Sequence, residues 1–491
     1  MRKKEVAHME KYIALMEKAR AWIDAHRDEF IAELQAWARI PSVSRADLAA
    51  PGMPFGPDCR KMLDFAMERG RHYGFDVTEH DGCACSITWG DGEDSIGMIA
   101  HLDVVPVGEG WVYPPFGATY LPEHDVMIGR GVDDNKGSAI AGLFAMRMLR
   151  EFGWPMRHGI RLMCGTSEET GMQDMQRLKE QGLRFPKVSL VPDAGFPVNF
   201  GQKGSVDATL HFPCEGNLLR LDAGSVRNII PDLAQCVVAM PVAEVQQAFA
   251  TLDAELMAYL TVEACPEGTA IAASGRSGHA AFLAGGDNAI SHLTRALAES
   301  GILQGSCAAA IRAVADLTAD AYGRSEGVAY SDEISGELTL VYGVAHLQNG
   351  VLKLSVDCRY PITCQGDALE AALRQDWARR GGSVAAFERS EPFYIPKDDP
   401  YVVALQAVYK AATGRDDEPY TMGGGTYSRV VTNAISFGPG MPGTKHDWSA
   451  FLPEGHGGAH GRDETIPMQK LYDCCCIYVA ALAAMDELVP S

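Results

Sequence analysis

Long apolar runs are missing from this sequence of 491 residues. No segment approaches the roughly 18 consecutive apolar residues that are typical of a membrane-spanning helix. Segment 1–20 carries charges in every turn, unlike the continuous apolar core of a signal peptide. We therefore expect a protein that has no membrane partner and is not exported by a signal peptide.

Basic residues are outnumbered as well. Lys and Arg total 43 against 64 for Asp and Glu, which gives a formal net charge of −21 at pH 7. A protein with this balance repels phosphate backbones and anionic lipid surfaces. Nucleic acid is therefore not expected as a partner.

The thirteen cysteines include no Cys-x-x-Cys pair, so the spacing of a zinc ribbon is absent. We interpret these cysteines as mostly buried thiols, which places the protein in a reducing cytoplasm.

Motifs of several other enzyme classes are also missing. The sequence has no His-Glu-x-x-His, no Gly-x-Ser-x-Gly and no phosphate-binding loop of the Walker type. Segment 438–443, GPGMPG, does fit Gly-x-Gly-x-x-Gly, but Pro439 and Pro442 lack the amide hydrogens that would bind a phosphate. Single-zinc helix proteases, serine-elbow hydrolases and dinucleotide-binding enzymes are therefore not expected.

Short apolar segments alternate with helical ones in the first part of the chain. Segments 95–105, 160–169 and 187–195 are apolar runs that end in acids or His, and segment 136–153 has helical periodicity. An amphipathic helix is predicted over 17–39, because the pattern stops before a proline. The alternation predicts an α/β fold with these strands in one sheet.

The chain is longer than the usual ~100–200 residues of one domain, so at least two domains are expected. Between residues 201 and 384 the sequence pattern changes to alternating strand-like segments and helical stretches such as 241–260. This pattern is typical of an α+β domain. We predict a first domain made of residues 1–200 and 385–491, interrupted by an inserted domain at 201–384. A strongly apolar helix is predicted at 467–488.

Acids and one histidine lie at or just after the ends of the predicted strands. They are His101 and Asp103, then Glu168 and Glu169, then Asp193. In open α/β sheets ligands bind beyond the carboxyl ends of the strands. We therefore expect these side chains to gather at one edge of the sheet.

Two more motifs carry possible metal ligands. GRGVDDNKG (129–137) places Asp133 and Asp134 on a Gly-rich turn before a helix, and AHGRDE (459–464) places His460 in a loop. Each motif alone has a structural explanation, such as a helix N-cap or a solvated turn. Together the motifs supply two imidazoles and at least three carboxylates, which suit two zinc-type ions that share one carboxylate.

The ordered set of motifs also resembles a known family. HLDVVP (101–106), GRGVDDNKG, GTSEETG (165–171), VPDAGFP (191–197) and AHGRDE are similar to motifs of the co-catalytic di-zinc exopeptidases related to glutamate carboxypeptidase, aminoacylase and succinyl-diaminopimelate desuccinylase. IPSVS (40–44), VRNIIP (226–231), SGHA (277–280), CRYP (358–361) and GGGTYSR (423–429) make the chain look most like PepV-type dipeptidases. The resemblance implies an α/β catalytic domain, with a central mixed sheet flanked by helices, and an inserted α+β lid domain.

The resemblance further implies two metal ions, zinc or else manganese or cobalt. Their ligands would be His101 and Asp193 for one ion, Glu169 and His460 for the other, and Asp134 as the bridge. His446 and His456 lie in the same His- and Gly-rich stretch as His460, but only His460 is followed by the residues of the motif.

The remaining roles also follow from the resemblance. Asp103 would orient His101, and Glu168 would be the general base. In the lid, His279 would stabilise the oxyanion, while Asn228 and Arg359 would hold the polar ends of the substrate. A lid of this length implies a monomer.

One position departs from the family pattern. Asn135 follows the bridging carboxylate, where an acid is often found. Because that position does not ligate metal in the family, we expect altered tuning of the site and no loss of metal.

Three functions remain open at this point. The first is hydrolysis of unblocked dipeptides, with a small peptide as the partner. The second is deacylation of N-acyl amino acids by the same metal chemistry. The third, a non-catalytic binding protein on the same scaffold, predicts the loss of Glu168 or of a ligand, and all these residues are present.

Overall fold

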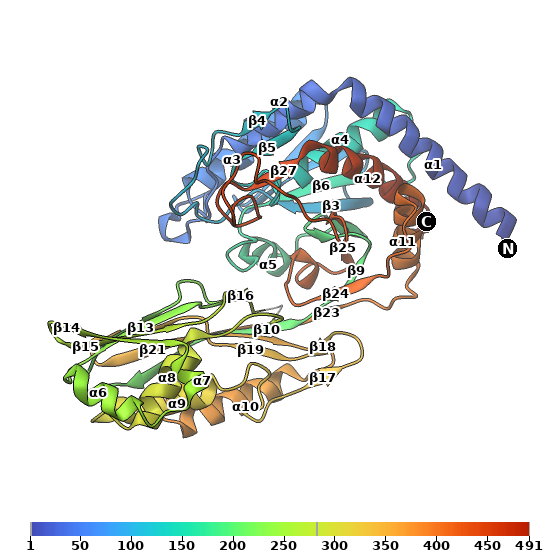
Figure 1. Ribbon diagram of the computed structural model, residues 1–491. Coiled ribbons are helices and arrows are strands. Elements are labelled where there is room, and N and C mark those ends of the chain that lie inside the picture. The colour runs from blue at the N-terminus through green and yellow to red at the C-terminus, as the bar shows by residue number, and fades with distance from the viewer. Residues whose placement is uncertain (1, 281–282, 491) are drawn as a thin grey trace. The chain divides into compact units, whose positions relative to one another are not determined.

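The structure is a computed structural model that describes residues 2–280 and 283–490 (Figure 1). The chain forms two compact units. Unit 1 comprises Met1–Phe200, Ile395–Tyr420 and Thr426–Ser491, and unit 2 comprises Gly201–Tyr394 and Thr421–Gly425. The sequence placed the return from the insert at residue 385. The structure places it at Ile395, because strand β22 (Ser383–Ser390) still pairs with β10 (Gly204–Pro213) of unit 2.

Unit 1 is built on a mixed sheet in the order β1-β2-β6-β3-β7-β25-β9. The bounds of these strands are Asp76–His80 (β1), Ala84–Trp89 (β2), Ser95–His101 (β3), Gly159–Gly165 (β6), Ser189–Val191 (β7), Asn199–Gln202 (β9) and Ala434–Ser436 (β25). Strands β6, β3, β7 and β25 run parallel to one another, whereas β1, β2 and β9 are antiparallel to their neighbours. The central mixed sheet predicted from the sequence is confirmed.

Helices cover this sheet on both sides. They are α1 (Arg2–Ala25), α2 (Arg27–Ala38), α3 (Pro57–His72), α4 (Lys136–Glu151), α5 (Gln173–Glu180), α11 (Pro400–Thr413) and α12 (Met468–Leu488), with short 3-10 turns at Ala46–Leu48 and Tyr427–Arg429. Every residue of β3 and β6 is buried, as expected for parallel strands between two helical layers. The apolar helix α12 packs against α1, α4 and α11 (Figure 1).

Smaller sheets complete unit 1 and carry the loops of interest. Strand β5 (Val126–Ile128) lies between β4 (Thr119–Leu121) and β27 (Thr465–Pro467), and β8 (Ala194–Gly195) pairs with β26 (Pro439–Gly440). Because β27 is antiparallel to β5, the residues that follow β5 lie beside those that precede β27. This pairing joins two motifs that are more than 300 residues apart in the chain.

Unit 2 is an α+β unit with an antiparallel sheet in the order β14-β15-β13-β11-β20-β21-β10-β22, in which β19 also pairs with β21. Besides β10 and β22, the strands are Leu218–Ala223 (β11), Leu233–Val238 (β13), Leu260–Cys265 (β14), Gly268–Ser274 (β15), Thr339–Val341 (β19), Ala345–Gln348 (β20) and Val351–Tyr360 (β21). Burial alternates along β10 and β15, because one face of the sheet packs on the core and the other does not.

The helices of unit 2 lie on the buried face of its sheet (Figure 1). They are α6 (Val242–Phe249), α7 (Ala254–Met257), α8 (Ala289–Ser300), α9 (Ser306–Leu317) and α10 (Gly366–Arg379). Short strands β12 (Ile229–Ile230) and β16 (Gly278–His279), which are distant in sequence, form an antiparallel pair, and β17 (Ser331–Asp332) and β18 (Gly336–Glu337) form a hairpin. Two further short strands, β23 (Phe393–Tyr394) and β24 (Tyr420–Met422), lie where the chain passes between the units.

Two predicted helices are each broken in the structure. The helix predicted over 17–39 is divided at His26, whose amide bonds to the Ile23 carbonyl and whose Nδ1 lies 2.7 Å from the Trp22 carbonyl. The helix predicted over 241–260 ends at Phe249 and restarts after Asp253, which caps α7 by accepting a bond from the Leu256 amide. In both cases local side-chain bonding overrides the apolar periodicity.

Two remaining expectations concern helices and cysteines. In the part of the chain that the structure describes, no helix combines the length and the apolar character needed to cross a membrane. The thirteen cysteines are free thiols, and all except Cys265 and Cys364 are buried.

Candidate metal centre

The five predicted metal ligands all lie in unit 1, at the ends of strands. His101 is the last residue of β3, Glu169 follows β6, and Asp193 lies between β7 and β8. Asp134 follows β5, and His460 precedes β27. The parallel alignment of β3, β6 and β7 brings their carboxyl ends to one edge, and the β5–β27 pairing delivers the other two residues there.

Asp134 lies between two imidazoles. Its Oδ1 is 2.9 Å from His101 Nε2, and its Oδ2 is 2.9 Å from His460 Nε2. Glu169 Oε1 is also 2.9 Å from His460 Nε2. The single carboxylate thus presents one oxygen to each histidine, which is the arrangement needed to share it between two ions.

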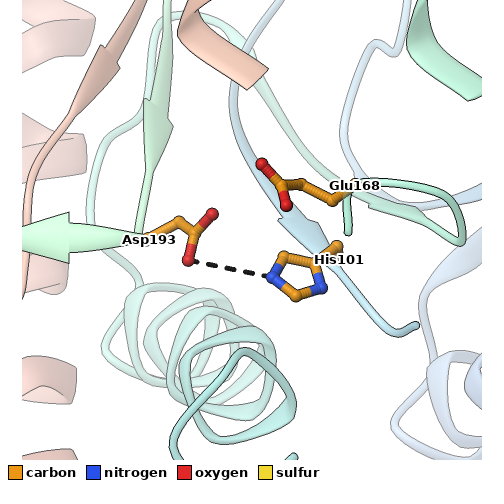
Figure 2. Close-up of side chains that lie close together, drawn as sticks. All are labelled: His101, Glu168 and Asp193. Carbon is orange, nitrogen blue, oxygen red and sulfur yellow. Dashed lines mark ion pairs between the residues drawn. The ribbon is translucent and has the colours of Figure 1, made fainter. Parts of the chain in front are cut away.

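A second group forms around His101. Figure 2 shows Glu168 and Asp193 pointing towards the His101 ring, with Asp193 Oδ1 3.8 Å from Nε2. One donor atom from each of the three residues lies within 4.8 Å of the others, and the same holds for His101, Asp134 and Glu169. His101 is fully buried, so the two groups share a side chain that is shielded from water.

The pKa values at the site reflect crowded negative charge. Burial, followed by the charge of Asp134, raises the pKa of Asp193 to about 6, and burial raises the pKa of Glu169 to about 7. Burial and the charges of Asp193 and Glu169 hold the pKa of Glu168 well above its usual value. Hydrogen bonds to Asp134 and Glu169 raise the pKa of His460 to about 11. Any added positive charge would therefore be strongly favoured here.

The donor chemistry fits divalent metal ions. Imidazole nitrogen and carboxylate oxygen are the ligands that zinc prefers in catalytic sites, and manganese and cobalt accept the same set. His101 occurs in both groups, but its Nδ1 lies 3.0 Å from the Asp103 carbonyl, so its Nε2 is left to bind a single ion. Among the described residues, neither group includes His446, His456 or His460. His460 is distinguished by its Nε2, which lies 2.9 Å from both Asp134 and Glu169.

The two competing histidines have other contacts. His456 Nδ1 lies 2.6 Å from Asp463 Oδ2, and Asp463 also accepts the amides of Val112 and Tyr113. The His446 ring stacks on Trp448. Both rings therefore contact residues other than the predicted metal ligands, which composition alone could not show.

Asp103 contacts more of the site than the sequence indicated. His101 Nδ1 is 3.0 Å from the Asp103 main-chain carbonyl and 3.5 Å from the Asp103 carboxylate. The carboxylate itself accepts the amides of Glu168 and Glu169, each at 3.1 Å. Asp103 therefore contacts three of the site residues through separate atoms.

Asn135 contacts the site through its amide group. Its Nδ2 donates to the Pro192 carbonyl at 2.7 Å and to Asp193 Oδ1 at 3.1 Å. An unprotonated acid at this position could not donate either bond. The departure from the family pattern thus supplies a hydrogen bond to a predicted ligand.

Sequence reasoning missed Glu464 and Arg130. Buried Glu464 accepts the amides of Gly131, Asp133 and Asp134, and it pairs with the Arg130 guanidinium at 2.8 Å. Arg130 also donates to the His460 carbonyl. The pair therefore fixes the backbone on both sides of the Asp134–His460 contact. Both residues lie within quoted motifs, but nothing in those motifs indicates that their partners are backbone atoms.

The three lid residues lie in unit 2. His279 lies on β16 and Asn228 directly precedes β12, and Asn228 Nδ2 is 3.4 Å from His279 Nε2. Arg359 lies on β21, where Nε and Nη2 form a bidentate pair with Asp357 at 2.8 and 2.6 Å. The structure therefore brings Asn228 and His279 together, and it shows that the fork of Arg359 already has a carboxylate partner.

Comparisons with known proteins agree with these observations. The sequence model of peptidase family M20/M25/M40 matches residues 97–484. A protein of Bacillus subtilis (strain 168) named "Putative dipeptidase YtjP" is 30% identical over 475 residues, covering 93% of this chain and 97% of the relative. "Putative dipeptidase SSP1012" of Staphylococcus saprophyticus is 27% identical over 477 residues, covering 94% and 97%.

Solved structures share the fold. Human carnosine dipeptidase 1 superposes with a TM-score of 0.57 at 15% identity, covering 96% of this chain and 99% of its own. Aminoacylhistidine dipeptidase from Vibrio alginolyticus gives a TM-score of 0.53 at 13% identity, covering 94% and 96%. The resemblance drawn from the motifs is confirmed by the family match, which spans most of the chain and includes every predicted site residue. The chain belongs to peptidase family M20/M25/M40.

Proposed function

We propose that the protein is a di-zinc dipeptidase that hydrolyses the peptide bond of unblocked dipeptides. The observation that carries the metal assignment is Asp134, whose two oxygens each lie 2.9 Å from a different histidine. His101 and Asp193 would hold one ion, Glu169 and His460 the other, and Asp134 both. Both sequence relatives are named as putative dipeptidases, which supports dipeptides as the substrate class.

Glu168 would be the general base. Bound zinc ions would make a water molecule more acidic and polarise the scissile carbonyl. The Glu168 carboxylate would take the proton from that water and pass it to the leaving amine. Burial and neighbouring acids raise the pKa of Glu168, which suits a group that must both accept and return a proton.

The proposal also covers three residues of unit 2, the oligomeric state of the protein and its compartment. His279 would donate to the developing oxyanion, while Asn228 and Arg359 would bind the polar ends of the dipeptide. Arg359 would have to share its guanidinium between the substrate and Asp357. We also propose that the protein works as a monomer in a reducing cytoplasm, where its thirteen free thiols would persist. Light scattering of the purified protein would test the monomer.

The second candidate, an N-acyl amino acid deacylase, would use the same metal centre. Metal-loaded protein should be offered free dipeptides together with their N-acetylated and tripeptide counterparts. Cleavage confined to free dipeptides is the expected result. Cleavage of the acylated compounds alone would move the protein to the deacylases and leave the ligand assignment intact. Cleavage of neither class would overturn the proposed function.

A further inference from the structure

The turn that carries Glu168 and Glu169 has an unusual set of bonds. Four consecutive amides, those of residues 166–169, are all accepted by two carboxylates. Asp174 accepts the amides of Thr166 and Ser167 at 2.6 and 2.9 Å. Asp103 accepts the next two at 3.1 Å each. Both acids are fully buried, so these bonds are protected from competition with water.

Asp174 is held in turn by Tyr427. The Tyr427 hydroxyl donates to Asp174 Oδ2 at 2.6 Å, the same oxygen that accepts both amides, while Oδ1 accepts the Met175 amide at 2.7 Å. Tyr427 is fully buried and follows the Gly-rich segment 423–425. Burial raises the pKa of Asp174 only to about 6, so the group is ionised at neutral pH and can accept from all four donors.

The backbone before the turn leaves room for this pair. A Cβ built on Gly165 would collide with the Tyr427 hydroxyl and with Asp174 Oδ2. Any other residue at 165 would thus separate the tyrosine, the aspartate and the strand end. The carbonyls of Ser167 and Glu168 are also bound, by the amides of Met172 and Gly171. Most backbone groups of the turn are therefore hydrogen-bonded, which restricts its movement.

We propose that Tyr427 and Asp174 are positioning residues for the general base: their hydrogen bond fixes the 166–169 turn and thereby the location of Glu168. This inference rests on the proposed function, because it assigns the pair a role in that reaction. The Asp103 carboxylate is tied to the His101 strand, whereas the Tyr427–Asp174 pair supports the turn from outside that strand. The Thr166 hydroxyl adds a further support by donating to the Cys83 carbonyl at 2.8 Å. Misplacing a reacting group by about 1 Å costs roughly a hundredfold in rate.

The test compares Tyr427→Phe, Asp174→Asn and the double variant with the unmodified protein. Tyr73→Phe is the matched control, since its hydroxyl donates to buried Glu33 at 2.9 Å without contact to the turn. Each variant is loaded with zinc and assayed for kcat, KM, bound zinc and amide exchange of segment 165–172, using whichever substrate class the unmodified protein cleaves.

We expect Tyr427→Phe to lower kcat about ten- to a hundredfold with KM changed less than about twofold, with two zinc ions retained and faster exchange of the 166–169 amides. Because Tyr427 acts through Asp174, the double variant should lose no more activity than Asp174→Asn alone. Tyr73→Phe should leave kcat unchanged.

Several outcomes would overturn the inference. One is an unchanged kcat in Tyr427→Phe, and another is a loss matched by Tyr73→Phe, which would show a general effect of losing a buried hydroxyl. A loss of zinc in parallel with kcat would indicate that the pair positions the metal ligand Glu169 and not the base Glu168. If the unmodified protein cleaves neither substrate class, the proposed function fails and this role fails with it. Faster exchange in Tyr427→Phe would then still show that the pair holds the turn.

Discussion

Three buried acids beside the metal centre in unit 1 have different partners from two buried acids of unit 2. In unit 1, Asp103, Asp174 and Glu464 bond mainly to backbone amides of the loops that carry the metal centre. In unit 2, Asp357 and Asp376 pair with arginine side chains two and four positions further along the chain. An acid bonded to amides fixes the course of the backbone, whereas an arginine can exchange one carboxylate for another. In unit 1 these acids hold the backbone of the loops in place, whereas in unit 2 the two acids order arginine side chains.

Metal removal should produce the largest difference in stability between the two units. Chelation of the zinc-loaded protein should abolish activity and destabilise unit 1, because crowded carboxylates lose the charge that offsets their repulsion. Hydrogen exchange should accelerate in segments 101–105, 129–135, 165–171 and 191–195, but not in β13 and β15. Equal acceleration in both units, on protein shown beforehand to contain metal, would remove the distinction.

Substitution of the base should have the next largest effect. Glu168→Gln should lower kcat by about 10²–10⁴, the usual contribution of a general base, while both metals remain bound. Exposed Glu180→Gln, on α5, is the matched control and should retain full activity. Retained turnover in Glu168→Gln, measured beside metal content, would take Glu168 out of this role.

In unit 2 the corresponding change should affect catalysis without affecting metal. His279→Ala should lower kcat by about 10²–10³, the cost of one lost oxyanion donor, and leave zinc content unchanged. The control is His346→Ala, because His346 lies in the same unit, half-exposed, and pairs only with Asp222 among the contacts described. If His279→Ala lost zinc, the assignment of metal binding to unit 1 alone would be contradicted.

The smallest effect concerns the stability of unit 2. Burial raises the pKa of Glu326 to about 7, and its Oε1 accepts the Tyr342 hydroxyl. The pKa of glutamate in an unfolded chain is about 4.3. Between these values the unfolded state releases a proton that the folded state keeps, so the stability that Glu326 contributes is lost as pH rises to about 7.

Glu326→Gln should therefore gain stability relative to the unmodified protein as pH rises from 5 to about 7, at up to about 1.4 kcal/mol per pH unit, and level off above that. Urea denaturation at several pH values would measure the difference. Exposed Glu333→Gln should show no such trend. A constant difference across this range would mean that Glu326 is not protonated in the folded state.

The sequence predicted the parts of the site that short motifs carry. His101 and Glu169 could be placed because each directly ends or follows an apolar strand, and parallel strands bring such positions to one edge. Glu464, Asp174 and Tyr427 could not be assigned a role. Their partners are backbone amides or residues far along the chain, such as Tyr427 and Asp174, which are 253 positions apart. Residue type does not indicate such pairings.

The same limit applies to the fold. Buried strands such as β3 and β6 were predicted because their apolar runs are short and end in polar residues, which is typical of strands buried on both faces. The breaks at His26 and Asp253 were missed, because apolar periodicity continues through both and only local hydrogen bonds decide where the helix ends. The end of unit 2 was misplaced for a related reason: β22 is an edge strand in which no residue is fully buried, so its sequence carries little apolar signal.

The division of unit 1 into separate stretches of chain has a consequence for synthesis. As the chain leaves the ribosome, all of segment 201–394 is available before β25, β27 and α12 exist. Unit 2 can therefore complete its sheet early, whereas unit 1 must wait for the strand that pairs with β7 and for the helix that packs on α1 and α4. His460 emerges later than the other predicted ligands. Nascent chains that stop short of it would carry a finished unit 2 beside an incomplete metal centre.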